Sequence, residues 1–225
     1  MSSHVPVVLQ IDIVSDVVCP WCYIGKRQLD EAIARWQQEN PRSPAPLLRW
    51  RPFQLNPDMP AEGMPRSAYL MQKFGSPDGG NRYDRVRAAA REVGLELRLD
   101  AIRIQPSTLK PHGLMEIAED GSTQTALAEQ LFKAYFIDGR DLSDDETLRR
   151  IAAKAGLDKG LVDAALAAES VSRLVAAADA ELREYGVTGV PLFILGSDRA
   201  ERVVVSGAQG AGALLQAMQQ VQAAS

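Results

Sequence analysis

The stretch Asp16-Val-Val-Cys-Pro-Trp-Cys22 holds both cysteines of this chain of 225 residues. An apolar run, Val7 to Val14, precedes the stretch, and a helix-like run, Tyr23 to Glu39, follows it. Cysteines that serve only as small apolar core residues would be scattered along the chain, whereas these two are separated by only two residues. Their placement predicts that they carry chemistry.

The segments on either side predict a strand and a helix. Residues 5–14 are β-branched and nearly continuous in apolar character, which is typical of a central strand covered on both faces. Residues 15–18 then form a turn, whose first two side chains are available to cap the helix. Along the helix, Cys22, Leu29, Ile33 and Trp36 recur at helical spacings. Cys22 therefore begins the buried stripe, and Cys19 lies almost one turn earlier, exposed at the open helix end.

The two cysteines have different expected roles. The unpaired N–H groups and the positive end of the helix dipole favour a thiolate at Cys19, and the thiolate is the attacking form. We therefore expect Cys19 to be the nucleophile and Cys22 the resolving thiol. Pro20 suits the first helical turn, and Trp21 places a large ring beside the sulfurs. Both are candidate substrate contacts.

A Cys-X-X-Cys pair also occurs as half of a structural zinc site. A complete site needs two further ligands, and only His4 and His112 remain as histidines, in no paired spacing. We therefore expect no metal.

Further along the chain, residues 47–55 predict a second strand, parallel to the first. Helix-like runs follow at residues 65–74, 83–93, 123–137 and 144–155, and the third carries an apolar stripe that predicts deep burial. Ser143 and Glu146 have the spacing of a capping box. A helix from about Ser170 to Tyr185, strands at 191–195 and 202–205 around a turn at 196–199, and a helix at 213–223 complete the chain.

Three stretches together resemble one known family. Residues Asp16 to Lys26, Gly186-Val-Thr-Gly-Val-Pro-Leu-Phe193 and Ser206-Gly-Ala-Gln209 are similar to the DsbA-like thioredoxin-fold oxidoreductases, specifically a FrnE-like branch related to 2-hydroxychromene-2-carboxylate isomerases and kappa-class glutathione transferases. The resemblance implies that Pro191 is cis and faces the cysteines, and that the backbone of Val190 pairs with substrate. Relatives of the isomerase and transferase type tend to carry serine where Cys19 stands, which favours redox chemistry here.

The resemblance and the order of elements predict an α/β protein, a thioredoxin fold with a large all-helical insertion. We expect residues 1–56 to form the first thioredoxin-like part, 57–169 the helical insertion, and 170–225 the second thioredoxin-like part.

Composition and charge limit the partners and the cellular location that we expect for this protein. The formal net charge of −4 is spread without long runs, so we expect neither nucleic acid nor an anionic membrane as a partner. No window approaches the roughly 20 apolar residues that span a bilayer. The first residues lack the basic start and cleavage site of a secretory signal. These features predict a cytoplasmic protein.

Asp12 and His112 are two further residues with a possible role near the cysteines. Asp12, in the strand that leads to the cysteines, is either a solvated strand residue or a proton acceptor for Cys22. His112 follows a proline in an expected turn, and we interpret it as structural or exposed.

The leading hypothesis is a thiol-disulfide oxidoreductase, with isomerase activity as an extension, whose only redox group is the Cys19–Cys22 pair. Its partners are protein or small-molecule thiols and disulfides, and glutathione is a candidate co-substrate. One alternative is a glutathione-dependent isomerase or transferase. The other is a redox-gated binding or chaperone module.

Overall fold

A four-stranded mixed sheet forms the centre of the computed structural model, which describes residues 8–118, 120–197 and 200–224. The strand order is β2-β1-β5-β6, with β1 and β2 parallel and the other pairs antiparallel. The strands are β1 (Gln10–Ser15), β2 (Leu47–Pro52), β5 (Leu192–Ser197) and β6 (Ala200–Ser206). The parallel pair and the hairpin are confirmed. The first residues of the predicted first strand, 5–7, and two residues of the predicted turn, 198 and 199, lie outside the described residues, while Gly196 and Ser197 belong to β5.

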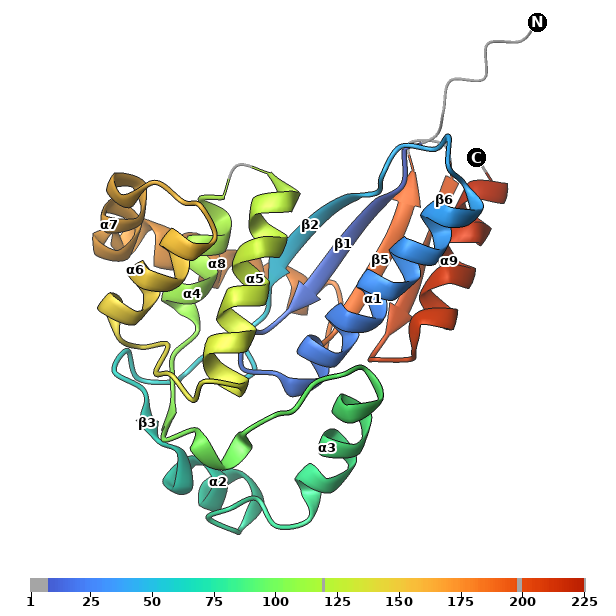
Figure 1. The fold of residues 1–225 in the computed structure, drawn as a ribbon. Coiled ribbons are helices and arrows are strands. Elements are labelled where there is room, and N and C mark those ends of the chain that lie inside the picture. The colour runs from blue at the N-terminus through green and yellow to red at the C-terminus, as the bar shows by residue number, and fades with distance from the viewer. Residues whose placement is uncertain (1–7, 119, 198–199, 225) are drawn as a thin grey trace, which may run out of the picture.

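Two helices pack together on one face of this sheet (Figure 1). They are α1 (Pro20–Glu39) and α9 (Ala211–Ala223). Ile11 and Ile13 of β1 and Phe193 of β5 are buried in the same core as the apolar sides of these helices. Residues of the opposite face, such as Val14, form a smaller cluster with Phe53 and Leu182. The alternation follows from the two-residue period of a strand.

The segment between β2 and α8 is helical apart from one short pairing, β3 with β4. Its elements are β3 (Met64–Pro65), α2 (Arg66–Phe74), α3 (Arg82–Glu92), the short helix η1 (Leu99–Ala101), β4 (Ile104–Gln105), α4 (Leu109–Glu116), α5 (Gly121–Phe136), α6 (Asp145–Lys154) and α7 (Lys159–Ala167), followed by α8 (Glu169–Glu184). The four predicted helical runs correspond to α2, α3, α5 and α6. A thioredoxin fold interrupted after its second strand is thus confirmed, while the residue ranges proposed for its three parts stay predictions.

The buried helix α5 joins this segment to the sheet. Its predicted apolar stripe is confirmed, and α5 lies along β2 (Figure 1). Phe132 stacks on Tyr23 of α1 with ring centroids 5.0 Å apart. Trp50 of β2 donates a hydrogen bond of 3.0 Å from its indole Nε1 to the hydroxyl of Thr125. Aromatic stacking of this kind adds to the free energy gained from burying the rings, so α1, β2 and α5 share one core.

The predicted capping box at Ser143 is wrong. Helix α6 has Asp144 as its N-cap, and the carboxylate of Asp144 accepts a 2.8 Å hydrogen bond from the backbone N–H of Thr147. Ser143 lies one residue too early, and its hydroxyl bonds to Asp141 instead. Glu146 pairs with Arg150 one turn along the helix. An aspartate next to a serine competes for the same role, and spacing alone does not rank them.

The expected turn at His112 is also wrong. Pro111 and His112 lie in helix α4, which begins after Thr108. Pro111 is tolerated because it falls in the first turn, where the backbone N–H has no helical partner. His112 is buried there.

Candidate active site

The two cysteines lie where β1 turns into α1. Cys19 is the N-cap residue, with extended backbone angles of φ −92° and ψ 114°, and Pro20 opens the helix. No side chain accepts a capping hydrogen bond at this end, so the suggestion that Ser15 or Asp16 caps α1 is wrong. The open N–H groups and the positive helix dipole are therefore directed at Cys19, as the sequence predicts.

Both cysteines are free thiols, and both are buried. Only 4% of Cys19 and 2% of Cys22 is exposed, so the expectation of an exposed Cys19 is wrong. Cys19 instead lines a hollow of about 720 Å³ between the start of α1, the loop before β5, and helices α2 and α3. Pro20, Trp21 and Val190 line the same hollow. The hollow gives a substrate access to Cys19, whereas Cys22 is not among its lining residues.

Burial raises the pKa of the Cys22 thiol well above its ordinary value, and the hydrogen bond and charge of the neighbouring Cys19 raise it further. The side chain of Ser15 and the backbone of Asp16 act in the opposite direction through hydrogen bonds to Cys22. Desolvation disfavours the charged form of any acid, which explains the dominant cause. Cys22 is therefore held as a neutral thiol behind Cys19.

The loop before β5 faces Cys19. The Val190–Pro191 peptide bond is cis, which confirms the expectation taken from the family resemblance. The Cys19 sulfur donates to the carbonyl oxygen of Val190 across 3.7 Å. On the neighbouring turn of α1, a Cβ added to Gly25 would lie 3.0 Å from the Pro191 side chain. Gly25 thus permits the close approach of Pro191 to the helix that carries both thiols.

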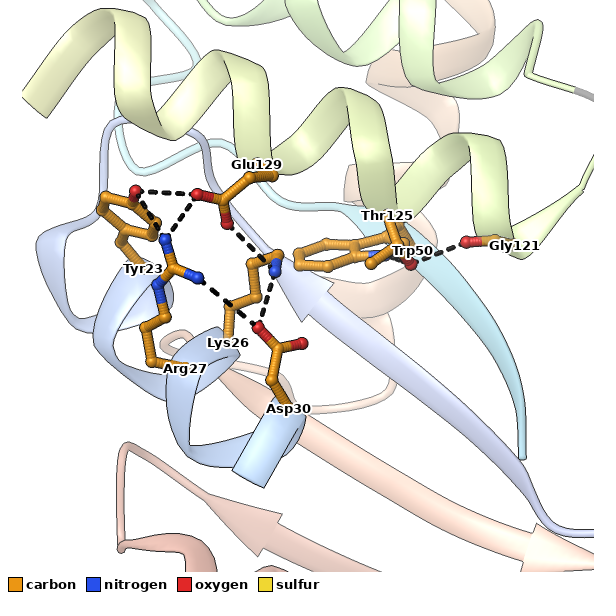
Figure 2. A network of polar contacts seen from close by, with 8 residues as sticks. All are labelled: Tyr23, Lys26, Arg27, Asp30, Trp50, Gly121, Thr125 and Glu129. Atoms are coloured by element: carbon orange, nitrogen blue, oxygen red, sulfur yellow. Dashed lines mark hydrogen bonds and ion pairs between the residues drawn. The ribbon is translucent and has the colours of Figure 1, made fainter. Parts of the chain in front are cut away.

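A polar network fixes α1 against α5 (Figure 2). The Lys26 side chain, in a residue that is 5% exposed, lies between Asp30 at 2.8 Å and Glu129 at 3.0 Å. Glu129 also pairs with Arg27 at 2.6 Å and accepts a 3.0 Å hydrogen bond from the hydroxyl of Tyr23. Burial and the charge of Glu129 raise the pKa of Tyr23 to about 12. The network orients the first two turns of α1, which carry both cysteines.

Asp12 does not act on Cys22. Its carboxylate makes two hydrogen bonds, of 2.7 and 2.8 Å, with Arg49 on the neighbouring strand β2. Its neighbours Ile11 and Ile13 are the residues of β1 that belong to the main core with α1, so Asp12 points to the opposite face. The proton-acceptor interpretation is wrong because strand alternation directs this side chain away from the thiols.

A different acid is buried near the cysteines. Asp16 is 0% exposed, and its carboxylate accepts hydrogen bonds from the backbone N–H groups of Leu55, at 2.7 Å, and Val18, at 3.3 Å. His112 Nε2 lies 3.6 Å from the same carboxylate. From the sequence, Asp16 was predicted only to be a possible cap of α1. Its position three residues before Cys19 was the only sign in the sequence that it lies at the site.

Helices α2 and α3 supply the far side of the Cys19 hollow, a contribution that was not predicted from the sequence. Basic and aromatic side chains dominate their contribution: Arg66, Tyr69, Lys73, Phe74, Arg82, Tyr83 and Arg85. Among the described residues, no group of three histidines, cysteines, aspartates or glutamates is placed to hold a metal ion. Within the same residues, no helix has both the length and the apolar character to cross a bilayer.

This protein has a Cys-X-X-Cys pair at a helix start that faces a cis-proline loop in a thioredoxin fold. This arrangement places it in the class of thioredoxin-fold dithiol proteins. The model of the DSBA-like thioredoxin domain matches residues 10–219, and the chain belongs to that family. A solved structure described as a probable DsbA oxidoreductase from Streptomyces coelicolor is 32% identical, with a TM-score of 0.79 over 96% of this chain and 90% of that one.

Two more distant structures share the fold. The cytosolic disulfide reductase DsbM from Pseudomonas aeruginosa, solved with GSH, is 19% identical, with a TM-score of 0.63 over 95% of this chain and 96% of that one. A 2-hydroxychromene-2-carboxylate isomerase is 16% identical, with a TM-score of 0.63 over 94% of this chain and 95% of that one. At these identities, both structures show that the fold is shared.

Proposed function

We propose that this protein is a thiol-disulfide oxidoreductase in which Cys19 attacks and Cys22 resolves. The observation that carries the proposal is the contrast between the two thiols. Cys19 is the N-cap residue at an open helix end and lines a hollow, whereas Cys22 does not line the hollow and its pKa is raised. Thiolate is the nucleophile in disulfide exchange, so the sulfur at the helix end is the one equipped to attack.

The reaction proceeds through a mixed disulfide. The Cys19 thiolate attacks one sulfur of a substrate disulfide, and the other sulfur leaves as a thiolate. Cys22 then transfers its proton and attacks Cys19, which releases the second substrate thiol and leaves a Cys19–Cys22 disulfide. The reverse sequence oxidises a substrate dithiol. If a different thiol of the substrate, instead of Cys22, attacks the mixed disulfide, Cys19 leaves as a thiolate and the substrate keeps a rearranged disulfide. This outcome is isomerisation.

Pro20, Trp21, Val190 and Pro191 are the proposed substrate contacts. The carbonyl of Val190 lies close to the Cys19 sulfur, a position from which it can accept a hydrogen bond from an extended peptide. Pairing through backbone groups tolerates many substrate sequences.

Glutathione is the proposed low-molecular-weight co-substrate, and the cytoplasm the proposed location. Support comes from DsbM of Pseudomonas aeruginosa, a cytosolic disulfide reductase with the same fold that was solved with GSH. In a reducing compartment, a disulfide of this kind is transient and catalytic.

Replacement of each cysteine by serine tests the proposal. Cys19→Ser should abolish both insulin reduction and oxidation of reduced ribonuclease, whereas Cys22→Ser should accumulate mixed disulfides that mass spectrometry detects. Unchanged activity of Cys19→Ser would refute the assignment. Client binding that survives loss of both thiols would instead support a binding module, and turnover of a chromene carboxylate by Cys22→Ser would support the isomerase alternative.

A further inference from the structure

The hollow that Cys19 lines is cationic. Arg66, Lys73, Arg82 and Arg85 line it, and among the described residues that line it none is acidic. The chain as a whole has a net charge of −4, so this concentration of positive charge is local. A concave site lined by one sign of charge concentrates ligands of the opposite sign.

Arg66 differs from the other three cations because it is buried, with 7% of the residue exposed. One Nη donates to the amide oxygen of Gln105 and the other to the hydroxyl of Tyr83, at 2.5 Å. The guanidinium also lies 5.3 Å from the ring centroid of Tyr69. All three partners are neutral, and Nε has no hydrogen-bond partner among the described residues.

No carboxylate of the described residues forms an ion pair with Arg66. Asp78 and Asp100 line a smaller hollow, of about 300 Å³, that Arg66 and Tyr83 also line, and both aspartates are exposed. Lys26 provides the comparison within the same chain, because it is equally buried but contacts two carboxylates (Figure 2). Buried charges are ordinarily paired, since desolvation without a counter-charge is costly.

We propose that the Cys19 hollow selects disulfides and thiols that carry a carboxylate, and that Arg66 binds this carboxylate. Arginine suits the role because its planar guanidinium matches the geometry of a carboxylate, and Gln105 and Tyr83 occupy only two of its five N–H donors. Lys73, Arg82 and Arg85 contribute the wider positive field. The volume of about 720 Å³ suits a small molecule or a short acidic peptide. The inference rests on the proposed redox function and names its substrate class.

Two disulfides, each with two methylene groups between a sulfur and its end group, allow the effect of ligand charge to be measured apart from disulfide reactivity. 3,3′-Dithiodipropionate ends in carboxylates, and 2-hydroxyethyl disulfide ends in neutral hydroxyls. In a single turnover, the reduced protein gives two electrons and two protons to the disulfide, which leaves as two thiols, while Cys19 and Cys22 become a disulfide. Oxidation is followed by acid quenching, alkylation of remaining thiols and mass spectrometry. The measured quantity is the ratio of the two rate constants, anionic over neutral.

We expect Arg66→Met to lower this ratio about 10- to 100-fold, the range that hydrogen bonds to charged groups imply. Arg85→Gln, at an exposed position, should lower it only a few-fold, and added salt should lower it in the wild type. Arg150→Gln is the matched control. It removes the same charge from an exposed ion pair on α6 and should leave the ratio unchanged.

Suberate, a dicarboxylate of the same length without sulfur, gives a second measurement that does not depend on folding of the Arg66 variant. It should inhibit oxidation of the wild type by the anionic disulfide, whereas 1,6-hexanediol should not. An unchanged ratio in folded Arg66→Met, or no inhibition by suberate, overturns the proposal while leaving the redox function intact. If neither disulfide oxidises the reduced protein, the redox function fails, and calorimetric titration with suberate still decides the anion site.

Discussion

His112 Nε2 lies 3.6 Å from a carboxylate oxygen of Asp16, and both side chains are buried beside the turn that leads to Cys19. The same carboxylate accepts hydrogen bonds from the backbone of Leu55 and Val18. It therefore connects the end of β1 to the segment that follows β2. Asp16 positions the turn before the thiols, and His112 brings helix α4 into the contact.

Removal of the Asp16 carboxylate should destabilise the fold. Asp16→Ala leaves the buried N–H of Val18 and the partly buried N–H of Leu55 without an acceptor. Each costs roughly 1–3 kcal/mol, so the free energy of unfolding should fall by about 2–6 kcal/mol. Asp16→Asn keeps one acceptor oxygen and should cost less. Urea denaturation measures both. Equal losses in the two variants would contradict the role assigned to the hydrogen bonds.

Lys26 should be more important for stability than an exposed cation on the same helix. Lys26→Met removes a positive charge that compensates the carboxylates of Asp30 and Glu129. We expect the free energy of unfolding to fall by about 1–3 kcal/mol, which is less than for a fully buried ion pair because both acids are partly exposed. Arg35→Gln, which removes an exposed pair with Glu31, should cost less than about 1 kcal/mol. Thermal and urea unfolding of the two variants give the comparison.

Local pattern predicted much of this fold, because strand alternation and helical periodicity are recorded within each segment. Cys19 and Cys22 were found from spacing alone, and the position of α5 in the core from its stripe. The partners of buried charges were not predictable in this way. Lys26 meets Glu129 more than 100 positions away, and a single lysine or arginine in a helix has the sequence appearance of a solvated residue. Arg66 was missed for the same reason.

The approach of Pro191 to α1 should depend on Gly25. A methyl group at this position meets the Pro191 side chain at 3.0 Å and the ring of Phe193 at 3.1 Å. We expect Gly25→Ala to cost about 1–3 kcal/mol through overpacking and to lower disulfide-exchange activity. Gly212→Ala is the control, because a Cβ there has no neighbour within 4 Å in helix α9. It should be neutral or slightly stabilising. A loss of the same size in both variants would disprove the steric explanation.

Cys19 should react with alkylating agents before Cys22. Because the pKa of the Cys22 thiol is raised well above its ordinary value, Cys22 stays protonated near neutral pH, and protonated thiols alkylate slowly. We expect iodoacetamide at pH 7 to label the folded, reduced protein at Cys19 alone, and to label both residues after unfolding in urea. Peptide mapping by mass spectrometry identifies the sites. Preferential labelling of Cys22 would reverse the assigned roles.

The raised pKa of Cys22 also predicts a loss of stability at alkaline pH. The unfolded chain ionises this thiol near its ordinary pKa of 9.0, whereas the folded chain retains the proton. The contribution of Cys22 to stability is therefore complete below that pH and is lost as the pH rises toward the raised pKa of the folded state, with a limiting slope of about 1.4 kcal/mol per pH unit. Tyr23, whose folded pKa is about 12, adds a loss in the same direction only above pH 10, the ordinary range of a tyrosine.

Guanidinium denaturation of the reduced protein between pH 8 and pH 10 measures this loss apart from that of Tyr23. The reduced wild type should become less stable across the interval, and Cys22→Ala should show a shallower dependence, because it has no thiol at this position to ionise. Since the thiol also contributes packing, only the slope with pH and not the absolute stability of the variant is compared. Parallel slopes in the two proteins would mean that the folded state does not hold the Cys22 proton, and the division of roles between the two sulfurs would lose its physical basis.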